Sequence, residues 1–184
     1  GGASRGYYPK SLNIYARDEY GDNRLRYDFW GTGYYPKRMT LSSGGNDNRG
    51  KMMDRLASEL LEITDFGTMN YEPYILFLNG EYWGFYYLTE KYDEQYLEHY
   101  YDVNRDNVII IKNDSLEVGT ETDAVLYAEM VAFVENADMT IDEYYQSACN
   151  MLDIQSFIDY FAAEIYMARE LDWPSSNYAL WRVR

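Results

Sequence analysis

The sequence predicts an α+β fold, with an antiparallel, strand-rich first part and a mainly helical second part. Apolar residues alternate with a period of two in much of the first part, and recur at helical spacing in most of the second. The strongest local signal is Asn79-Gly80 between two apolar runs, because both residue types tolerate the positive φ of a tight hairpin turn. We therefore expect two lobes, residues 1–90 and residues 91–184.

The first segment of the chain is predicted to form strands. Apolar and polar residues alternate over residues 12–17 and again over 25–29, on either side of a turn at residues 20–23. This pattern predicts an antiparallel hairpin within residues 1–29. A third strand is predicted over residues 37–42.

A helix and a second hairpin follow. Apolar residues recur at helical spacing over residues 52–63, and Gly67 is predicted to end that helix. The Asn-Gly pair then joins predicted strands at residues 74–78 and 82–88.

The second part is predicted to contain several helices and two short extended segments. Thr140 and Glu143 have the spacing of a capping box, which predicts a helix start. The expected elements are a helix over 93–100, a strand over 108–111, helices over 122–136, from 140 and over 154–170, and an extended segment over 178–183.

Composition excludes several classes of protein. The net charge of −15 argues against a general nucleic-acid binder, which needs a basic surface for phosphate. One cysteine, Cys149, excludes an internal disulfide framework, and one histidine, His99, leaves little for a His-based metal site or a Ser–His–Asp triad. No stretch approaches the roughly 20 apolar residues of a membrane span.

The charge is unevenly distributed along the chain. Residues 1–60 hold ten Lys and Arg against seven Asp and Glu, whereas residues 61–184 hold six against 24. One interpretation is a solvated acidic surface. The other is a first part that binds phosphate and an acidic remainder that binds a basic partner. The 22 tyrosines also keep open a sugar-binding or adhesive module.

The order of predicted elements matches the plan of a protein kinase. That chemistry needs a Lys on the nucleotide phosphates, a helix carboxylate that holds the Lys, and a loop with Asp and Asn five positions apart. The chain has four such Asp/Asn pairs, whereas chance supplies about one. Only Asp172/Asn177 lies between an apolar helix and an apolar strand, which is where a catalytic loop belongs.

Four segments, in this order, carry a resemblance to a known family. They are Ser4-Arg5-Gly6-Tyr7-Tyr8-Pro9-Lys10-Ser11-Leu12, Asp54-Arg55-Leu56-Ala57-Ser58-Glu59-Leu60, Leu78-Asn79-Gly80-Glu81-Tyr82-Trp83-Gly84-Phe85-Tyr86 continuing to Glu90, and Asp172-Trp173-Pro174 continuing through Asn177 to Arg182. With them the chain resembles the spore coat kinase family of CotH type, a group of atypical kinases with a protein-kinase-like, two-lobed fold.

The resemblance implies transfer of the ATP γ-phosphoryl group to Ser or Thr of a protein, with Mg or Mn as the metal. It implies that Asp172 is the catalytic base and that Asn177 is a metal ligand. It also implies a secreted, cell-surface or spore-coat location in a bacterium. The acidic second part favours a basic Ser- or Thr-containing substrate.

The nucleotide-binding residues follow from the same resemblance. Lys10 is the candidate for the phosphates, with Arg5 nearby and Glu59 as the helix carboxylate that pairs with Lys10. Glu90 ends the second hairpin strand, at the hinge where an adenine would lie. Lys37 and Arg38 on the third strand remain alternatives to Lys10.

Two departures from the family pattern affect the expected activity. Glu170 stands where the family commonly has Asn, which could alter the pKa of Asp172 or the metal preference. The segment after Asn177 contains no carboxylate, whereas the family supplies its principal metal-binding Asp on a later segment. We therefore expect this chain to resemble a kinase domain without its last part and to be inactive by itself. The alternative function is a pseudokinase or a Tyr-rich module that binds protein or glycan.

Overall fold

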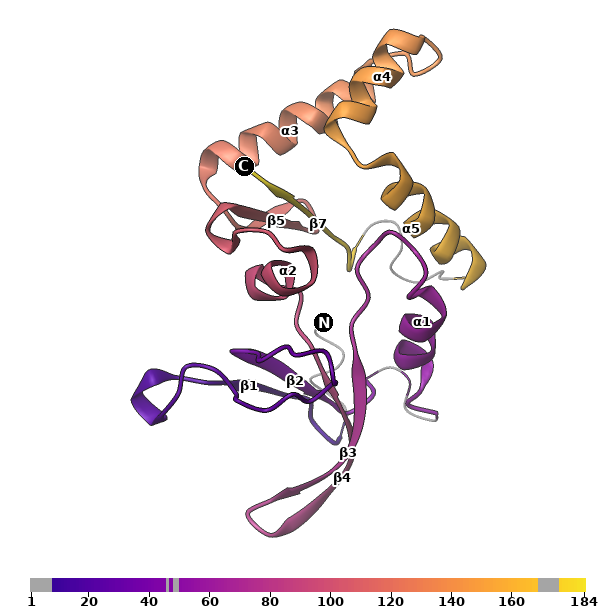
Figure 1. The fold of residues 1–184 in the computed structure, drawn as a ribbon. Helices are drawn as coiled ribbons and strands as arrows, with labels where there is room; N and C mark the ends of the chain where they lie inside the picture. Colours follow the sequence, from indigo (N-terminus) through magenta and orange to yellow (C-terminus); the bar gives the residue numbers. More distant parts are fainter. Residues whose placement is uncertain (1–7, 46, 48–49, 169–175) are drawn as a thin grey trace. The chain divides into compact units, whose positions relative to one another are not determined.

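A computed structural model describes residues 8–45, 47, 50–168 and 176–184 (Figure 1). Within these residues the chain forms two antiparallel sheets and five α-helices. The predicted α+β class is therefore confirmed.

The chain divides into two compact units. The first comprises residues 1–62 and 68–101, and the second comprises residues 63–67 and 102–184. The sequence-based boundary at residue 90 would place helix α2 (Glu94–Tyr101) in the second lobe, whereas the structure groups it with the first unit.

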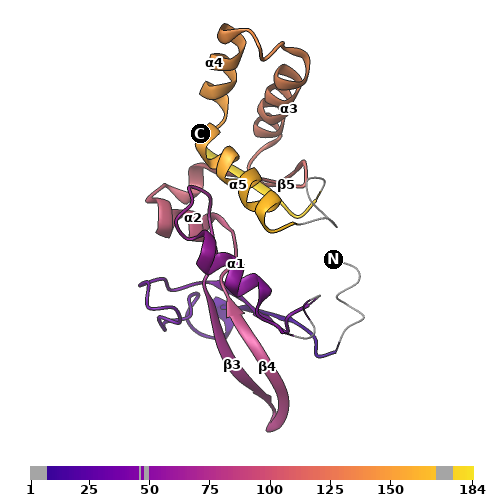
Figure 2. The same cartoon turned by 90° about the vertical axis from the view of Figure 1, so that its right-hand side faces the viewer.

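The first unit is built on a four-stranded antiparallel sheet in the order β1-β2-β4-β3. The strands are β1 (Leu12–Tyr15), β2 (Arg38–Ser42), β3 (Tyr71–Leu78) and β4 (Glu81–Thr89). Asn79 and Gly80 have φ values of 51° and 83°, so the predicted β3–β4 hairpin is confirmed. β2 pairs only with the last three residues of β4, and the remainder of the hairpin continues as a two-stranded ribbon (Figure 2).

The hairpin predicted within residues 1–29 is wrong. β1 pairs with β2 instead, and residues 25–29 form no strand. Leu25 and Phe29 pack against the buried core of the sheet, and the indole Nε1 of Trp30 donates to the carbonyl oxygen of Leu88 at 3.3 Å. Leu25 and Phe29 thus cover the core of the sheet rather than extend its edge.

Helix α1 (Met53–Leu61) ends six residues before Gly67, so the prediction that Gly67 ends this helix is wrong. Its first turn is held by a carboxylate. Asp47 Oδ2 accepts the backbone N–H groups of Met52 and Met53 at 2.7 and 3.0 Å. These bonds hold the pKa of Asp47 below its usual value. Asp47 therefore fixes the first turn of α1, where the helix leaves its N–H groups without internal partners.

The second unit contains a three-stranded antiparallel sheet in the order β6-β5-β7. Its strands are β5 (Val108–Lys112), β6 (Ser115–Val118) and β7 (Ala179–Val183). β5 and β7 lie where the sequence predicted extended segments, and β5 is the buried central strand. β6 was not predicted; it follows a tight turn in which Asn113 and Asp114 both have positive φ.

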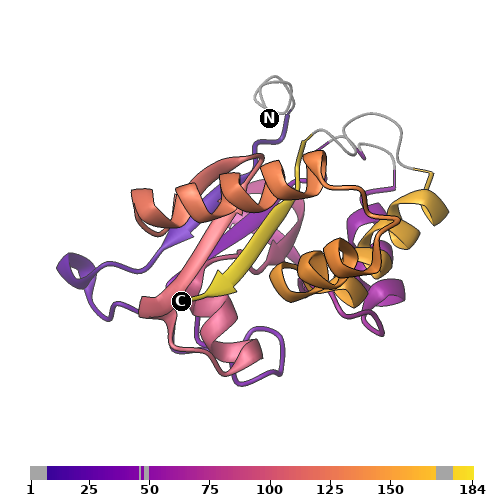
Figure 3. The ribbon, with the colours of Figure 1, turned by 90° about the horizontal axis from the view of Figure 1, so that it is seen from above.

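Three helices complete the second unit: α3 (Glu121–Asn136), α4 (Asp142–Met151) and α5 (Ile154–Tyr166). α3 runs over the sheet (Figure 3). The capping box predicted at Thr140 is wrong, because α4 begins at Asp142 and its N-cap is Ile141. The N–H and hydroxyl of Thr140 donate to Asp138 Oδ1 at 3.0 and 2.6 Å. Among the helices of the described residues, none is long and apolar enough to cross a membrane.

The start of α3 is bound to the end of β7 by a buried carboxylate. Asp123 Oδ2 accepts the N–H and hydroxyl of Thr120 at 2.7 and 2.8 Å. Arg184 Nη2 donates to the same oxygen at 2.6 Å, and its Nε lies 3.2 Å from both oxygens. The guanidinium holds the pKa of Asp123 well below its usual value.

We expect Asp123→Asn to lower the urea midpoint of unfolding at pH 7, because the amide cannot accept both the Arg184 fork and the Thr120 donors. Since the folded-state pKa of Asp123 is depressed, its stabilisation is present above the ordinary carboxyl pKa of about 4 and is lost as the pH falls through the folded value. The difference between the proteins should thus decline in acid. The control is Asp142→Asn, in the first turn of α4. Equal midpoints for the two variants would contradict this account.

Candidate functional site

The structure describes four of the six predicted site residues. Lys10, Glu59 and Glu90 lie in the first unit, and Asn177 lies in the second. Arg5 and Asp172 lie outside the described residues, as does Glu170.

Lys10 precedes β1 and has an exposed side chain on a fixed backbone. The hydroxyl of Tyr86, a residue with no exposed surface, donates to the carbonyl oxygen of Lys10 at 2.9 Å. The next residue is also fixed, since the N–H of Ser43 donates to Ser11 Oγ at 3.1 Å. The start of β1 is therefore held against the end of β2 and the centre of β4, while the ammonium group of Lys10 extends from that position.

Glu59 lies on the exposed side of α1 and pairs with a residue of its own helix. Arg55 Nε donates to Glu59 Oε1 at 2.7 Å, at the i, i+4 spacing that brings side chains together on a helix. The pairing of Glu59 with Lys10 stays a prediction.

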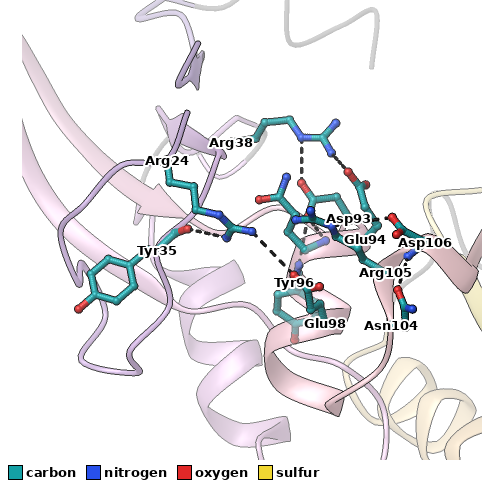
Figure 4. Close-up of polar contacts among 11 residues, drawn as sticks. Arg24, Tyr35, Arg38, Asp93, Glu94, Tyr96, Glu98, Asn104, Arg105 and Asp106 are labelled. Carbon is teal, nitrogen blue, oxygen red and sulfur yellow. Dashed lines mark hydrogen bonds and ion pairs between the residues drawn. The ribbon is translucent and has the colours of Figure 1, made fainter. Parts of the chain in front are cut away.

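Arg38, an alternative to Lys10, binds β2 to α2 (Figure 4). Its Nε lies 3.0 Å from Asp93 Oδ2, and its Nη2 lies 2.6 Å from Glu94 Oε1. Asp93 is buried and also caps α2 by accepting the backbone N–H groups of Gln95 and Tyr96. Burial raises the pKa of Asp93, and these bonds and Arg38 partly oppose that rise. The charge of Arg38 is thus already matched by two carboxylates.

The side chain of Glu90 lies inside the first unit and is only 1% exposed. Its Oε2 accepts the backbone N–H of Asn70 at 2.8 Å and the side-chain amide of Asn70 at 3.1 Å. The hydroxyl of Tyr100 donates to Oε1 and lies 3.0 Å from the hydroxyl oxygen of Thr32. Burial raises the pKa of Glu90, and the bonds from Tyr100 and Asn70 partly oppose the rise.

The partners of Glu90 were not predicted from the sequence as members of a site. Asn70 lies five positions after Asp65, and this pair is one of the three Asp/Asn pairs that do not lie between an apolar helix and an apolar strand. Tyr100 belongs to a Tyr pair at the end of α2, and Thr32 lies in a loop far away along the chain. No short motif links these positions, so only the fold could bring them together.

Asn177 directly precedes Tyr178 and β7, and has a positive φ of 65°. Tyr178 exchanges hydrogen bonds with Asn113 in the β5–β6 turn: its N–H donates to Asn113 Oδ1 at 3.3 Å, and its carbonyl accepts the Asn113 N–H at 3.2 Å. Asn177 is therefore held at the entry to the sheet. Within the part of the chain that is described, no three His, Cys, Asp or Glu side chains gather to hold a metal ion.

The α+β architecture, with a four-stranded antiparallel sheet and a single helix between β2 and β3, is consistent with a kinase-like fold. A family model described as CotH kinase protein matches residues 1–184, the whole chain. The chain therefore belongs to the CotH kinase family. Neither the curated proteins nor the solved structures give a match.

We expect Glu90→Gln to change how stability depends on pH. A carboxyl group whose folded-state pKa is raised stabilises the fold below its unfolded pKa, about 4.3 for Glu, and this contribution is lost as the pH rises through the folded value. Relative to wild type, the Gln variant should therefore gain stability as the pH rises from 4 towards 7. Urea unfolding at several pH values measures this, with Glu98→Gln on α2 as the control. A constant difference across the range would contradict the buried, raised carboxyl group.

Proposed function

We propose that this chain is part of an atypical protein kinase that transfers the ATP γ-phosphoryl group to Ser or Thr of a protein substrate. The observation that carries the proposal is the family match along the whole chain. The acidic charge of residues 61–184 supports a basic substrate. A secreted, surface or spore-coat location in a bacterium is part of the same proposal, from the family resemblance.

In this proposal Asp172 accepts the proton of the substrate hydroxyl and Asn177 binds a divalent metal. Phosphoryl transfer depends mainly on positioning and on stabilisation of charge. The fixed entry of Asn177 into β7 supports such a role, because a ligand before a sheet strand has a restricted position. ATP and Mg or Mn would supply the transferred group and the charge on its phosphates.

Lys10 is the proposed ligand of the ATP phosphates. Its backbone is held by Tyr86, its side chain is exposed, and the family resemblance singles it out. Tyr86 lies four residues before Glu90, which is about 13 Å of strand. Since the Glu90 side chain is buried, any adenine contact there would come from its backbone. This spacing along β4 leaves length for a nucleotide between Lys10, which is bound to Tyr86, and the backbone of Glu90.

In the family that the chain resembles, the principal metal-binding Asp lies on a later segment than the loop with Asp and Asn, and residues 178–184 contain no carboxylate. We therefore expect transfer by a protein that carries that later segment, and none by residues 1–184 alone. The loss of a main metal carboxylate removes charge stabilisation on which phosphoryl transfer depends.

In the longer protein, Asp172→Asn should lower the transfer rate by at least about 100-fold, because a positioned general base contributes on that scale. ATP binding should persist, since the base contacts the substrate hydroxyl. Radiolabelled ATP with a Lys- and Ser-rich peptide measures transfer. Asp102→Asn is the matched control, because Asp102 and Asn107 have the same spacing outside the predicted loop. Equal activity of both variants would overturn the assignment of Asp172.

The choice among the candidate cations can be tested by ATP binding. We expect Lys10→Ala to raise the dissociation constant for ATP about tenfold, the equivalent of roughly 1.4 kcal/mol. Lys37→Ala removes the same charge from an exposed position at the start of β2 and should have a smaller effect. Calorimetric titration with ATP and Mg or Mn compares the two. A larger loss of ATP affinity in the Lys37 variant would show that Lys37, and not Lys10, is the ligand of the phosphates.

A second candidate is a binding module without catalysis. The observation that favours it is a set of highly exposed tyrosines, because exposed aromatic rings are typical of protein and glycan contacts. They are Tyr8, Tyr20, Tyr27, Tyr82 and Tyr166, each more than 60% exposed. An inactive longer protein that still binds ATP or a glycan would support this candidate.

A further inference from the structure

A shallow groove of about 460 Å³ lies between α3 and the β5–β6 hairpin of the second unit. Ala124, Ala128 and Ala132 line it at intervals of four residues, on one side of the helix. Ile111 of β5 and Leu116 of β6 line it from the sheet. Methyl side chains leave space along α3, so the groove has an apolar surface wide enough for side chains of another molecule. We call it the α3 groove.

Two carboxylates also line the α3 groove. The hydroxyl of Tyr127 donates to Asp114 Oδ1 at 2.6 Å, and bonds from Tyr127 and Tyr178 hold the pKa of Asp114 below its usual value. Asp114 is therefore an ionised group in a fixed position at neutral pH. Glu135 also lines the groove, eight residues after Tyr127, which is about 12 Å along the helix axis.

The surrounding chain adds negative charge without compensation from its own helices. Residues 121–168, which contain α3, α4 and α5, hold ten Asp and Glu and no Lys, Arg or His. The neighbouring strands and the residue after them carry three cations against these ten carboxylates: Lys112, Arg182 and Arg184. Lys112 pairs with Glu117 at 3.9 Å and Arg184 with Asp123 at 2.6 Å. The field at the groove therefore favours cations and opposes anions.

We propose that the α3 groove binds a segment of a partner protein in which an aliphatic side chain lies between two basic residues. Charge complementarity selects this occupant: the apolar lining fits the aliphatic group, and Asp114 and Glu135 fit the two cations. The roughly 12 Å of helix axis between Tyr127, whose hydroxyl binds Asp114, and Glu135 corresponds to three or four residues of extended chain. The segment therefore has the pattern Lys or Arg, any residue, aliphatic, any residue, Lys or Arg. This inference concerns binding alone and does not depend on phosphoryl transfer.

The test is fluorescence anisotropy without ATP, using a labelled peptide Gly-Ser-Lys-Ala-Leu-Ala-Lys-Ser-Gly and the whole 184-residue chain. The contact is smaller than a standard protein interface, so we expect a dissociation constant on the order of 100 µM. Replacement of both Lys by Glu should abolish binding, and replacement of Leu by Ser should weaken it about tenfold. Binding should weaken as salt concentration rises.

Variants of the chain separate the groove from the general acidic surface. Ala128→Gln fills the groove at an exposed helix position without breaking the helix, and should weaken binding about tenfold. Glu135→Gln and Glu129→Gln each remove one charge from α3, but only Glu135 lines the groove. We therefore expect an effect from Glu135→Gln and little from Glu129→Gln.

Several outcomes would overturn the proposal. They are equal binding of the Glu-containing peptide, unchanged affinity of the Ala128→Gln variant, and equal effects of the two charge variants. A dimer in sedimentation analysis that Ala128→Gln dissociates would assign the groove to a second copy instead. Binding by residues 1–184 that is absent from the longer protein would assign it to another segment of the same chain. Asp172→Asn should bind the peptide like wild type, so failure here is distinguishable from failure of the proposed kinase activity.

Discussion

The buried carboxylate of Glu90 is the constraint on which the arrangement of the first unit depends. A carboxyl group away from water costs free energy unless donors surround it. Its donors come from Asn70, directly before β3, and from Tyr100 in the last turn of α2. Because Tyr100 also contacts Thr32, one side chain at the end of β4 fixes the positions of three segments distant along the chain.

The ion pair between Arg38 and Asp93 is a second contact that fixes α2 against the sheet of the first unit. Asp93 caps α2 and receives the guanidinium of a β2 residue, so α2 is bound to two strands of the sheet. The ring of His99 on α2 also stacks on Tyr34 at 5.1 Å. These contacts explain why α2 groups with the first unit, although it follows the predicted hinge. The chain that leaves β4 is therefore held by contacts to β2 and to α2. These contacts give the backbone near Glu90 a fixed geometry, which a binding site formed by backbone atoms needs.

The sequence predicted those elements whose cause is local. Asn79-Gly80 defines its turn by its own backbone preferences, and the apolar run of β5 needs burial whatever its partner. The hairpin within residues 1–29 could not be predicted correctly, because alternation does not say whether Leu25 and Phe29 extend a sheet or cover it. The partner of β1 lies beyond a long loop, and only the packing of that loop decides the pairing.

Helix starts and site residues were harder to predict, because the hydrogen-bond partners of their side chains cannot be read from local sequence spacing. Thr140 has the spacing of a cap, but its hydroxyl donates to Asp138 and the helix begins two residues later, at Asp142. The resemblance singled out Glu90, but its location inside the unit follows from Asn70 and Tyr100, which no motif connects. Lys10 was also singled out by resemblance, whereas the contact that fixes it comes from Tyr86 on β4.

The structure also limits which residues of the basic first part are candidates to bind phosphate. The five arginines that the structure describes in the first unit have carboxylate partners there: Arg17 with Glu19, Arg24 with Glu98, Arg26 with Asp22, Arg38 with Asp93 and Glu94, and Arg55 with Glu59. Exposed pairs are individually weak, but each partner lowers the positive potential that its arginine presents to an anion. These pairs weaken the case for the described arginines as ligands of a nucleotide. A lysine suits that role, since a compact ammonium on a flexible stem can follow a phosphate without a fixed planar geometry.

By contrast, helices α3, α4 and α5 of the second unit contain no cations that could neutralise their carboxylates. The same chain thus balances its charge internally where the nucleotide is proposed to bind and leaves it unbalanced where a basic partner is proposed to bind.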